Sequence, residues 1–74
     1  MFTKKIRLRT VDDVREFVKA ADKRSFRVDI QNGLTLIDAK SIMGVMSLDL
    51  TQNLTVVYEK ADPELEQVLK KFES

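Results

Sequence analysis

Two missing residue types narrow the chemistry that this sequence can perform. The 74 residues contain no histidine and no cysteine, so the commonest acid–base group, the commonest metal ligand and any thiolate nucleophile are absent. Two carboxylate pairs remain, Asp12 with Asp13 and Asp38 with Asp49. Such pairs usually cap helices or face water, and a chain this short offers no second layer to form a cleft around them. We therefore expect no catalytic residue, no metal site and no cofactor.

The one polar residue with a second possible role is Ser41, within the block from Lys40 to Leu48. It precedes an apolar helical segment, so its hydroxyl is expected to accept an amide hydrogen bond as the helix N-cap. A phosphate on the same oxygen would meet free helix N–H groups, with Lys40 next to it. Both roles stay open, because capping alone accounts for a serine here. Gly44 is costly inside a helix and predicts close approach of another backbone.

The same segment carries apolar side chains on two sides of a helix. At about 100° per residue, Val45 and Leu48 share one side. Ile42, Met43 and Met46 share the other side. A short helix in so small a domain cannot bury both sides, so we expect Ile42, Met43 and Met46 to be exposed. Exposed methionines suit a partner-binding surface, because the thioether adapts to differently shaped partners. Packing under a neighbouring loop is the alternative.

Alternating and helical apolar patterns predict the elements that position these residues. Strands are expected at residues 5–9, 26–31, 34–38 and 54–59, and helices at residues 11–21, 41–48 and 62–72. The order is βαββαβα, in one domain covering residues 1–74. A helix with a single apolar stripe needs a sheet to cover. We therefore predict an α+β fold in which a four-stranded antiparallel sheet is covered on one face by three helices.

Local signals mark the ends of these elements. Thr10 and Asp62 are typical N-cap residues, and Pro63 suits the first position of a helix. Asn32-Gly33 predicts a tight hairpin turn, because both residues accept a positive φ.

Composition and charge limit the partners and the location of the chain. A net charge of +1 gives no general attraction to nucleic acid or membranes. Lys4, Lys5, Arg7 and Arg9 make the start locally basic, but no aromatic residues are interleaved with them. We interpret them as a solvated strand face instead of an anion-binding patch. No apolar run is long enough for a signal peptide or a membrane span, and the lack of cysteine suits the cytoplasm.

The block from Lys40 to Leu48 resembles the signature around the regulatory serine of HPr, the small phosphocarrier of the bacterial sugar phosphotransferase system. The predicted element order also matches that family, and Asn32-Gly33 falls at its hairpin turn. The resemblance implies an open-faced two-layer β-sandwich. It also implies that Ser41 is the residue that HPr kinase/phosphorylase would phosphorylate, giving a product that binds a transcriptional repressor in carbon catabolite repression.

The N-terminal third departs from the family pattern. HPr has a His-Ala-Arg-Pro sequence at the start of its first helix, where the histidine carries the phosphoryl group and the arginine steadies it. Counting back from Ala21 without gaps places Thr10 near the histidine position and Asp12 near the arginine position. Asp12 and Asp13 would repel phosphate, and a threonine phosphoester is a poor phosphoryl donor. Residue chemistry therefore excludes phosphoryl carriage at this degenerate site.

Two functions remain open, and neither is enzymatic. In the first, the chain is similar to the catabolite-repression HPr of Gram-positive bacteria, which lacks the histidine but keeps the serine. It would then be a regulatory protein-binding domain whose partner is HPr kinase/phosphorylase or a repressor. The binding residues would be Lys40, Ser41, Ile42, Met43 and Met46. In the second, the chain is an interaction or structural module that kept the fold and lost both phosphorylation roles. In either case we expect a monomer or weak dimer that contacts neither nucleic acid directly nor a membrane.

Overall fold

Strands and helices alternate along the chain in the predicted order, in a computed structural model that describes residues 1–74. The strands are β1 (Phe2–Ile6), β2 (Val28–Asn32), β3 (Thr35–Asp38) and β4 (Leu54–Tyr58), and the helices are α1 (Val11–Asp22), α2 (Ile42–Met46) and α3 (Pro63–Lys71). None of the helices is long and apolar enough to cross a membrane.

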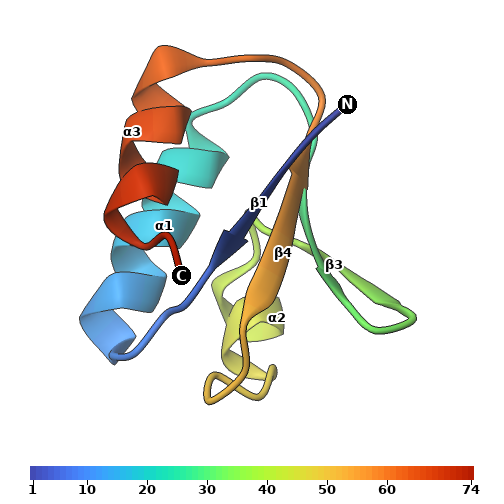
Figure 1. Ribbon diagram of the computed structural model, residues 1–74, viewed down its shortest axis with the longest axis vertical. Coiled ribbons are helices and arrows are strands. Elements are labelled where there is room, and N and C mark those ends of the chain that lie inside the picture. The colour runs from blue at the N-terminus through green and yellow to red at the C-terminus, as the bar shows by residue number, and fades with distance from the viewer.

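The four strands form one antiparallel sheet in the order β1-β4-β2-β3. All three helices lie on one side of it, so the protein has two layers and one open sheet face (Figure 1). This arrangement confirms the predicted fold. β4 occupies an interior position, as its apolar residues on both faces indicate. Leu54, Val56 and Tyr58 point into the core, while Val57 lies half-buried on the open face.

The core lies between the sheet and the helices and contains 16 buried apolar residues. Phe17 of α1 and Tyr58 of β4 are the largest of them. Both long helices begin as their caps predict. Thr10 accepts a hydrogen bond from the Asp13 amide, and Asp62 accepts one from the Leu65 amide, with Pro63 at the start of α3.

Several boundaries differ from the sequence-based expectations: β2 begins at Val28 instead of residue 26, α2 ends at Met46 instead of residue 48, and β1 and the hairpin turn are also displaced. β1 begins earlier than predicted, because Phe2 already pairs with Tyr58 of β4, and it ends earlier, because Ile6 is the last residue that pairs with β4. The Arg7 N–H donates to the Phe72 carbonyl at 2.8 Å instead. The hairpin turn lies one residue further along than predicted. Asn32 pairs with Thr35, which leaves Gly33 and Leu34 at the turn, and only Gly33 has a positive φ, of 63°.

A buried arginine joins three segments behind the sheet. Arg24 follows α1, and its side chain is only 8% exposed. Its Nη1 donates to the Asp62 carboxylate at 2.7 Å and its Nη2 to Glu64 at 3.2 Å, both at the start of α3. Its carbonyl accepts a hydrogen bond from Lys40 Nζ at 2.7 Å. The end of α1, the start of α3 and the turn before α2 are therefore held together.

Candidate functional site

Ser41 lies exposed at the start of α2, as the sequence predicts. Its backbone is extended (φ −99°, ψ 108°), and its hydroxyl accepts the Gly44 N–H at 3.1 Å. Its own N–H donates to the carbonyl of Asp38 at 3.1 Å. The N-cap prediction is confirmed, and the capping oxygen is also accessible from solvent.

Gly44 makes room for side chains and not for another backbone, so that expectation was wrong. A Cβ at this position would lie 3.0 Å from Cγ2 of Ile37 and 3.2 Å from the Ser41 hydroxyl oxygen. Such contacts are tighter than van der Waals packing normally allows. The glycine therefore lets the capping hydroxyl and a β3 side chain approach the helix together.

The two sides of α2 divide as predicted between core and solvent. Val45 is fully buried, and Leu48 packs against the core. Ile42, Met43 and Met46, which we call the α2 patch, are 43%, 82% and 43% exposed. Met43 is therefore largely exposed as predicted, whereas more than half of Ile42 and of Met46 is covered by the rest of the protein. The α2 patch and the Ser41 hydroxyl belong to adjacent residues of one exposed segment.

Lys40 does not offer its charge to Ser41, contrary to the expectation from sequence. Its ammonium group donates to the Arg24 carbonyl at 2.7 Å, and the residue is half-buried. A carbonyl just beyond a helix end lacks an intrahelical partner and carries the negative end of the helix dipole, so it attracts a cation. Lys40 therefore binds the segment that follows α1, and its charge does not face the Ser41 hydroxyl.

The start of α1, where the resemblance places the degenerate carrier position, is closed by hydrogen bonds. The Thr10 hydroxyl accepts the Asp13 N–H at 3.0 Å, and the Asp13 carboxylate accepts the Arg9 N–H at 2.9 Å. The hydrogen bond from the Arg9 N–H to the carboxylate is the largest cause that lowers the pKa of Asp13, so the carboxylate stays charged at neutral pH. Asp12, which the sequence favours at this position, is exposed, and its side chain makes no hydrogen bond. Asp13 is the closing residue because it lies three positions after the cap, the spacing of a capping box.

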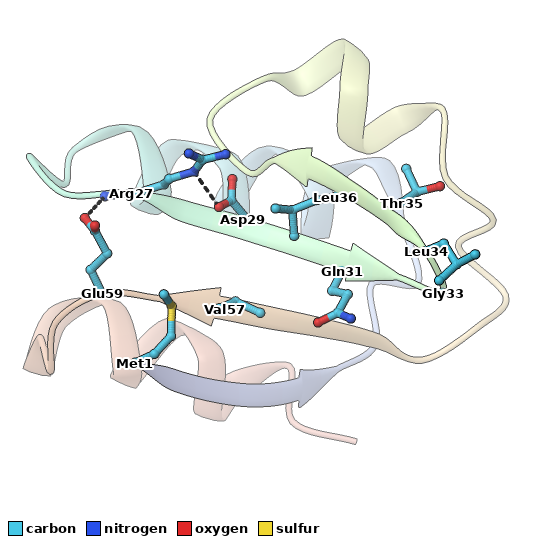
Figure 2. Close-up of a pocket in the computed structure, with 10 residues that line it drawn as sticks. All are labelled: Met1, Arg27, Asp29, Gln31, Gly33, Leu34, Thr35, Leu36, Val57 and Glu59. Atoms are coloured by element: carbon cyan, nitrogen blue, oxygen red, sulfur yellow. Dashed lines mark hydrogen bonds and ion pairs between the residues drawn. The ribbon is translucent and has the colours of Figure 1, made fainter.

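The surface has two hollows, and the α2 patch borders neither. The larger, about 600 Å³, lies on the open face and has apolar walls from Met1, Leu34, Leu36 and Val57 (Figure 2). The smaller, about 340 Å³, has a mostly polar lining of Ser25, Phe26, Arg27, Asp29, Asp38 and Lys40. Arg27 and Asp29 line both hollows, and the Arg27 Nε donates to the buried Asp29 carboxylate at 2.7 Å. No group of three or more acidic residues is close enough to hold a metal ion.

The chain is similar to one family of proteins in its sequence and to several solved structures in its fold. A family model described as "PTS HPr component phosphorylation site" matches residues 13–74. HPr-C-His from Thermoanaerobacter tengcongensis has a similar structure, with a TM-score of 0.76 and 24% identity over 96% of this chain and 93% of that chain. The phosphocarrier protein HPr from Bacillus anthracis str. Ames has a TM-score of 0.71 and 23% identity, over 97% of this chain and 96% of that chain. A Mycoplasma histidine-containing phosphocarrier protein has a TM-score of 0.70 and 21% identity, over 95% of this chain and 91% of that chain. No curated protein matches.

Proposed function

The chain belongs to the family of HPr components of the phosphotransferase system, and we propose that it acts there as a regulatory protein-binding domain, not as a phosphoryl carrier. The sequence contains no histidine to carry the group. The start of α1, where the family's carrier residue would stand, is closed by the Thr10–Asp13 hydrogen bond and a charged Asp13 carboxylate. A second anion at this helix end would be repelled by the charge of that carboxylate.

The exposed α2 patch carries the proposal. Burying a methionine side chain that is as exposed as Met43, at 82%, is worth about 1.5–3 kcal/mol. That corresponds to roughly ten- to a hundredfold in affinity. Ile42 and Met46, each 43% exposed, add further apolar surface that the isolated protein leaves in contact with water. A protein partner that covers them accounts for this arrangement.

Ser41 is the regulatory position within this proposal. Its hydroxyl oxygen would become the ester oxygen of a phosphoserine, and the group would bring a charge of about −2 next to the α2 patch. Lys40 is held by Arg24, so the cation that pairs with the phosphate comes from the partner. Arginine-rich surfaces recognise phosphate in this way. By resemblance the partners are HPr kinase/phosphorylase or a transcriptional repressor in the cytoplasm, and residues 1–74 act as a single domain.

The deciding experiment is phosphorylation by the HPr kinase/phosphorylase of the same organism, followed by intact-mass measurement. We expect a mass gain of one phosphoryl group for the native chain and none for the Ser41→Ala variant. Ser47, whose hydroxyl donates to the Gly44 carbonyl at 2.6 Å, is the matched control, and Ser47→Ala should be phosphorylated normally. An unchanged mass of the native chain would refute the phospho-regulatory role and would favour an interaction module without phosphorylation.

A further inference from the structure

The outer edge of β1 is only partly covered. The inner edge of β1 pairs with β4, from Phe2↔Tyr58 to Ile6↔Leu54. At the end of the strand, the C-terminal residues begin a further antiparallel pairing through the bridge Ile6↔Glu73. No strand lies beside the first half of β1, which forms the lowest strand of the sheet in Figure 2.

Within this uncovered half, the backbone groups of Thr3 point outward. The Arg7 N–H donates outward to the Phe72 carbonyl at 2.8 Å, and the Lys5 carbonyl accepts the Ser74 N–H at 3.2 Å. In an antiparallel strand, alternate residues direct both backbone groups to the same edge. The N–H and carbonyl of Thr3 therefore face outward as well, in line with those of Lys5 and Arg7. They are placed to bond an extended chain that continues the line of Glu73 and Ser74.

The positive charge along the outer edge of β1 favours an acidic segment as the additional strand. Lys4 and Lys5 are exposed, and neither takes part in any of the ion pairs of the structure. The first nine residues contain four basic side chains and no acid, and the one acid on the edge is Glu73 at the bridge. Directly opposite residues in an antiparallel pair have Cβ atoms about 4.5–5.5 Å apart, where opposite charges attract and like charges repel. Pairing with a second copy would gather the lysines of both chains in one patch.

We propose that the outer edge of β1 binds an extended acidic segment of a partner protein as an additional antiparallel strand. The Thr3 backbone supplies one donor and one acceptor to this strand, and Lys4 and Lys5 attract its carboxylates. Addition of a strand to a sheet edge is a known mode of peptide recognition. This surface is separate from the α2 patch, so it does not depend on the function proposed for Ser41.

The test uses a short capped peptide in which glutamate and valine alternate, added to the isotope-labelled native chain. We expect the Thr3 and Lys5 amide resonances to shift and the Thr3 amide to exchange more slowly, with weaker binding at higher salt. A matched peptide with lysine in place of each glutamate should cause neither effect. Absence of these effects at the highest soluble peptide concentration, or equal binding of both peptides, would overturn the proposal. So would concentration-dependent shifts of the same amides without peptide, because these would indicate a second copy.

A proline variant separates strand addition from simple charge attraction. Thr3→Pro removes the outward N–H and leaves the β4 pairing intact, as proline is tolerated on edge strands. We expect it to bind the acidic peptide roughly tenfold more weakly, while Thr3→Val binds like the native chain. Native-like binding by Thr3→Pro would overturn the strand geometry. If Thr3→Pro does not fold, Lys5→Glu decides: it should lose the acidic peptide, and unchanged binding would overturn the proposal.

Discussion

Replacing Thr10 by histidine would place at the start of α1 the residue type that carries the phosphoryl group in HPr, yet we expect the Thr10→His variant to accept no phosphoryl group. The side chain at this position stands at the N-cap of α1, next to Asp13. The Arg9 N–H holds the Asp13 carboxylate at 2.9 Å, so it cannot swing away without losing that hydrogen bond. A phosphorylated imidazole would share the helix end with this fixed charge and with the exposed carboxylate of Asp12.

The size of the effect follows from the charges and their spacing. With the phosphate about 6 Å from the Asp13 carboxylate, a dianion and a unit charge oppose each other by about 1.4 kcal/mol even at the dielectric constant of water. Salt screening reduces this energy, and the lower dielectric of a partner interface increases it. Asp12 adds a contribution of similar size. Phosphorylation is therefore disfavoured roughly tenfold to a hundredfold, before the missing arginine of the family pattern is considered.

The assay is transfer of radiolabelled phosphate from the first enzyme of the phosphotransferase system. Thr10→His should remain unlabelled, whereas the triple variant with Asp12→Arg and Asp13→Pro added should be labelled measurably. Position 13 lies in the first turn of α1, where proline is tolerated, so the triple variant should keep its helix. Circular dichroism controls for folding. Labelling of the single variant at a rate near that of a true HPr would refute the electrostatic reasoning.

Three further predictions concern stability and binding. Asp62→Ala removes both the cap of α3 and the partner of Arg24, so thermal unfolding should show a fall in Tm of at least about 4–8 °C, more than for Asp62→Asn. Because these hydrogen bonds lower the pKa of Asp62, its contribution is complete above about pH 4 and should be lost as the pH falls further. An equal loss at neutral and acid pH would contradict this. Burial, followed by the hydrogen bond to Glu66, raises the pKa of Tyr58 to about 12. The unfolded chain loses this proton near pH 10, so stability should fall from about pH 10 to pH 12 in the native chain and not in Tyr58→Phe. Absorbance titration of this one tyrosine measures the pKa directly, and a midpoint near 10 in the folded protein would refute it. Met43→Glu should leave Tm within a few degrees of native, since the side chain is 82% exposed. In calorimetric titration it should weaken partner binding at least tenfold, and unchanged affinity would exclude the α2 patch as the binding surface.

The fold could be predicted because each element has one face that must be buried. β4 is apolar on both faces, which indicated an interior strand, and the structure places it between β1 and β2. The Thr10 and Asp62 caps were also predictable, because capping depends only on residues three positions apart. The position of the hairpin turn could not be predicted from local sequence, because the register is set by pairing between the two strands, such as Ile30↔Ile37.

The candidate site was predicted less completely than the fold. Exposure of the α2 patch followed from helical geometry, because one short helix cannot bury two sides. The engagement of Lys40 could not be foreseen, since its partner is a carbonyl of Arg24, brought close only by the tertiary fold. The role of Asp13 had a local signal, because its carboxylate lies three residues after a threonine cap. The arginine position of the family pattern indicated Asp12 instead.

The strand order has a consequence for folding during synthesis. β2 and β3 are neighbours in sequence and can form a hairpin as soon as both have left the ribosome. β1 is made first, but its partner β4 is the last strand to emerge, and Phe2 must wait for Tyr58. Throughout that interval both edges of β1 are open to strands of other nascent chains. Lys4 and Lys5 make such mispairing unfavourable, because like charges repel when two β1 segments meet. These lysines therefore disfavour aggregation of nascent chains before β1 has paired with β4.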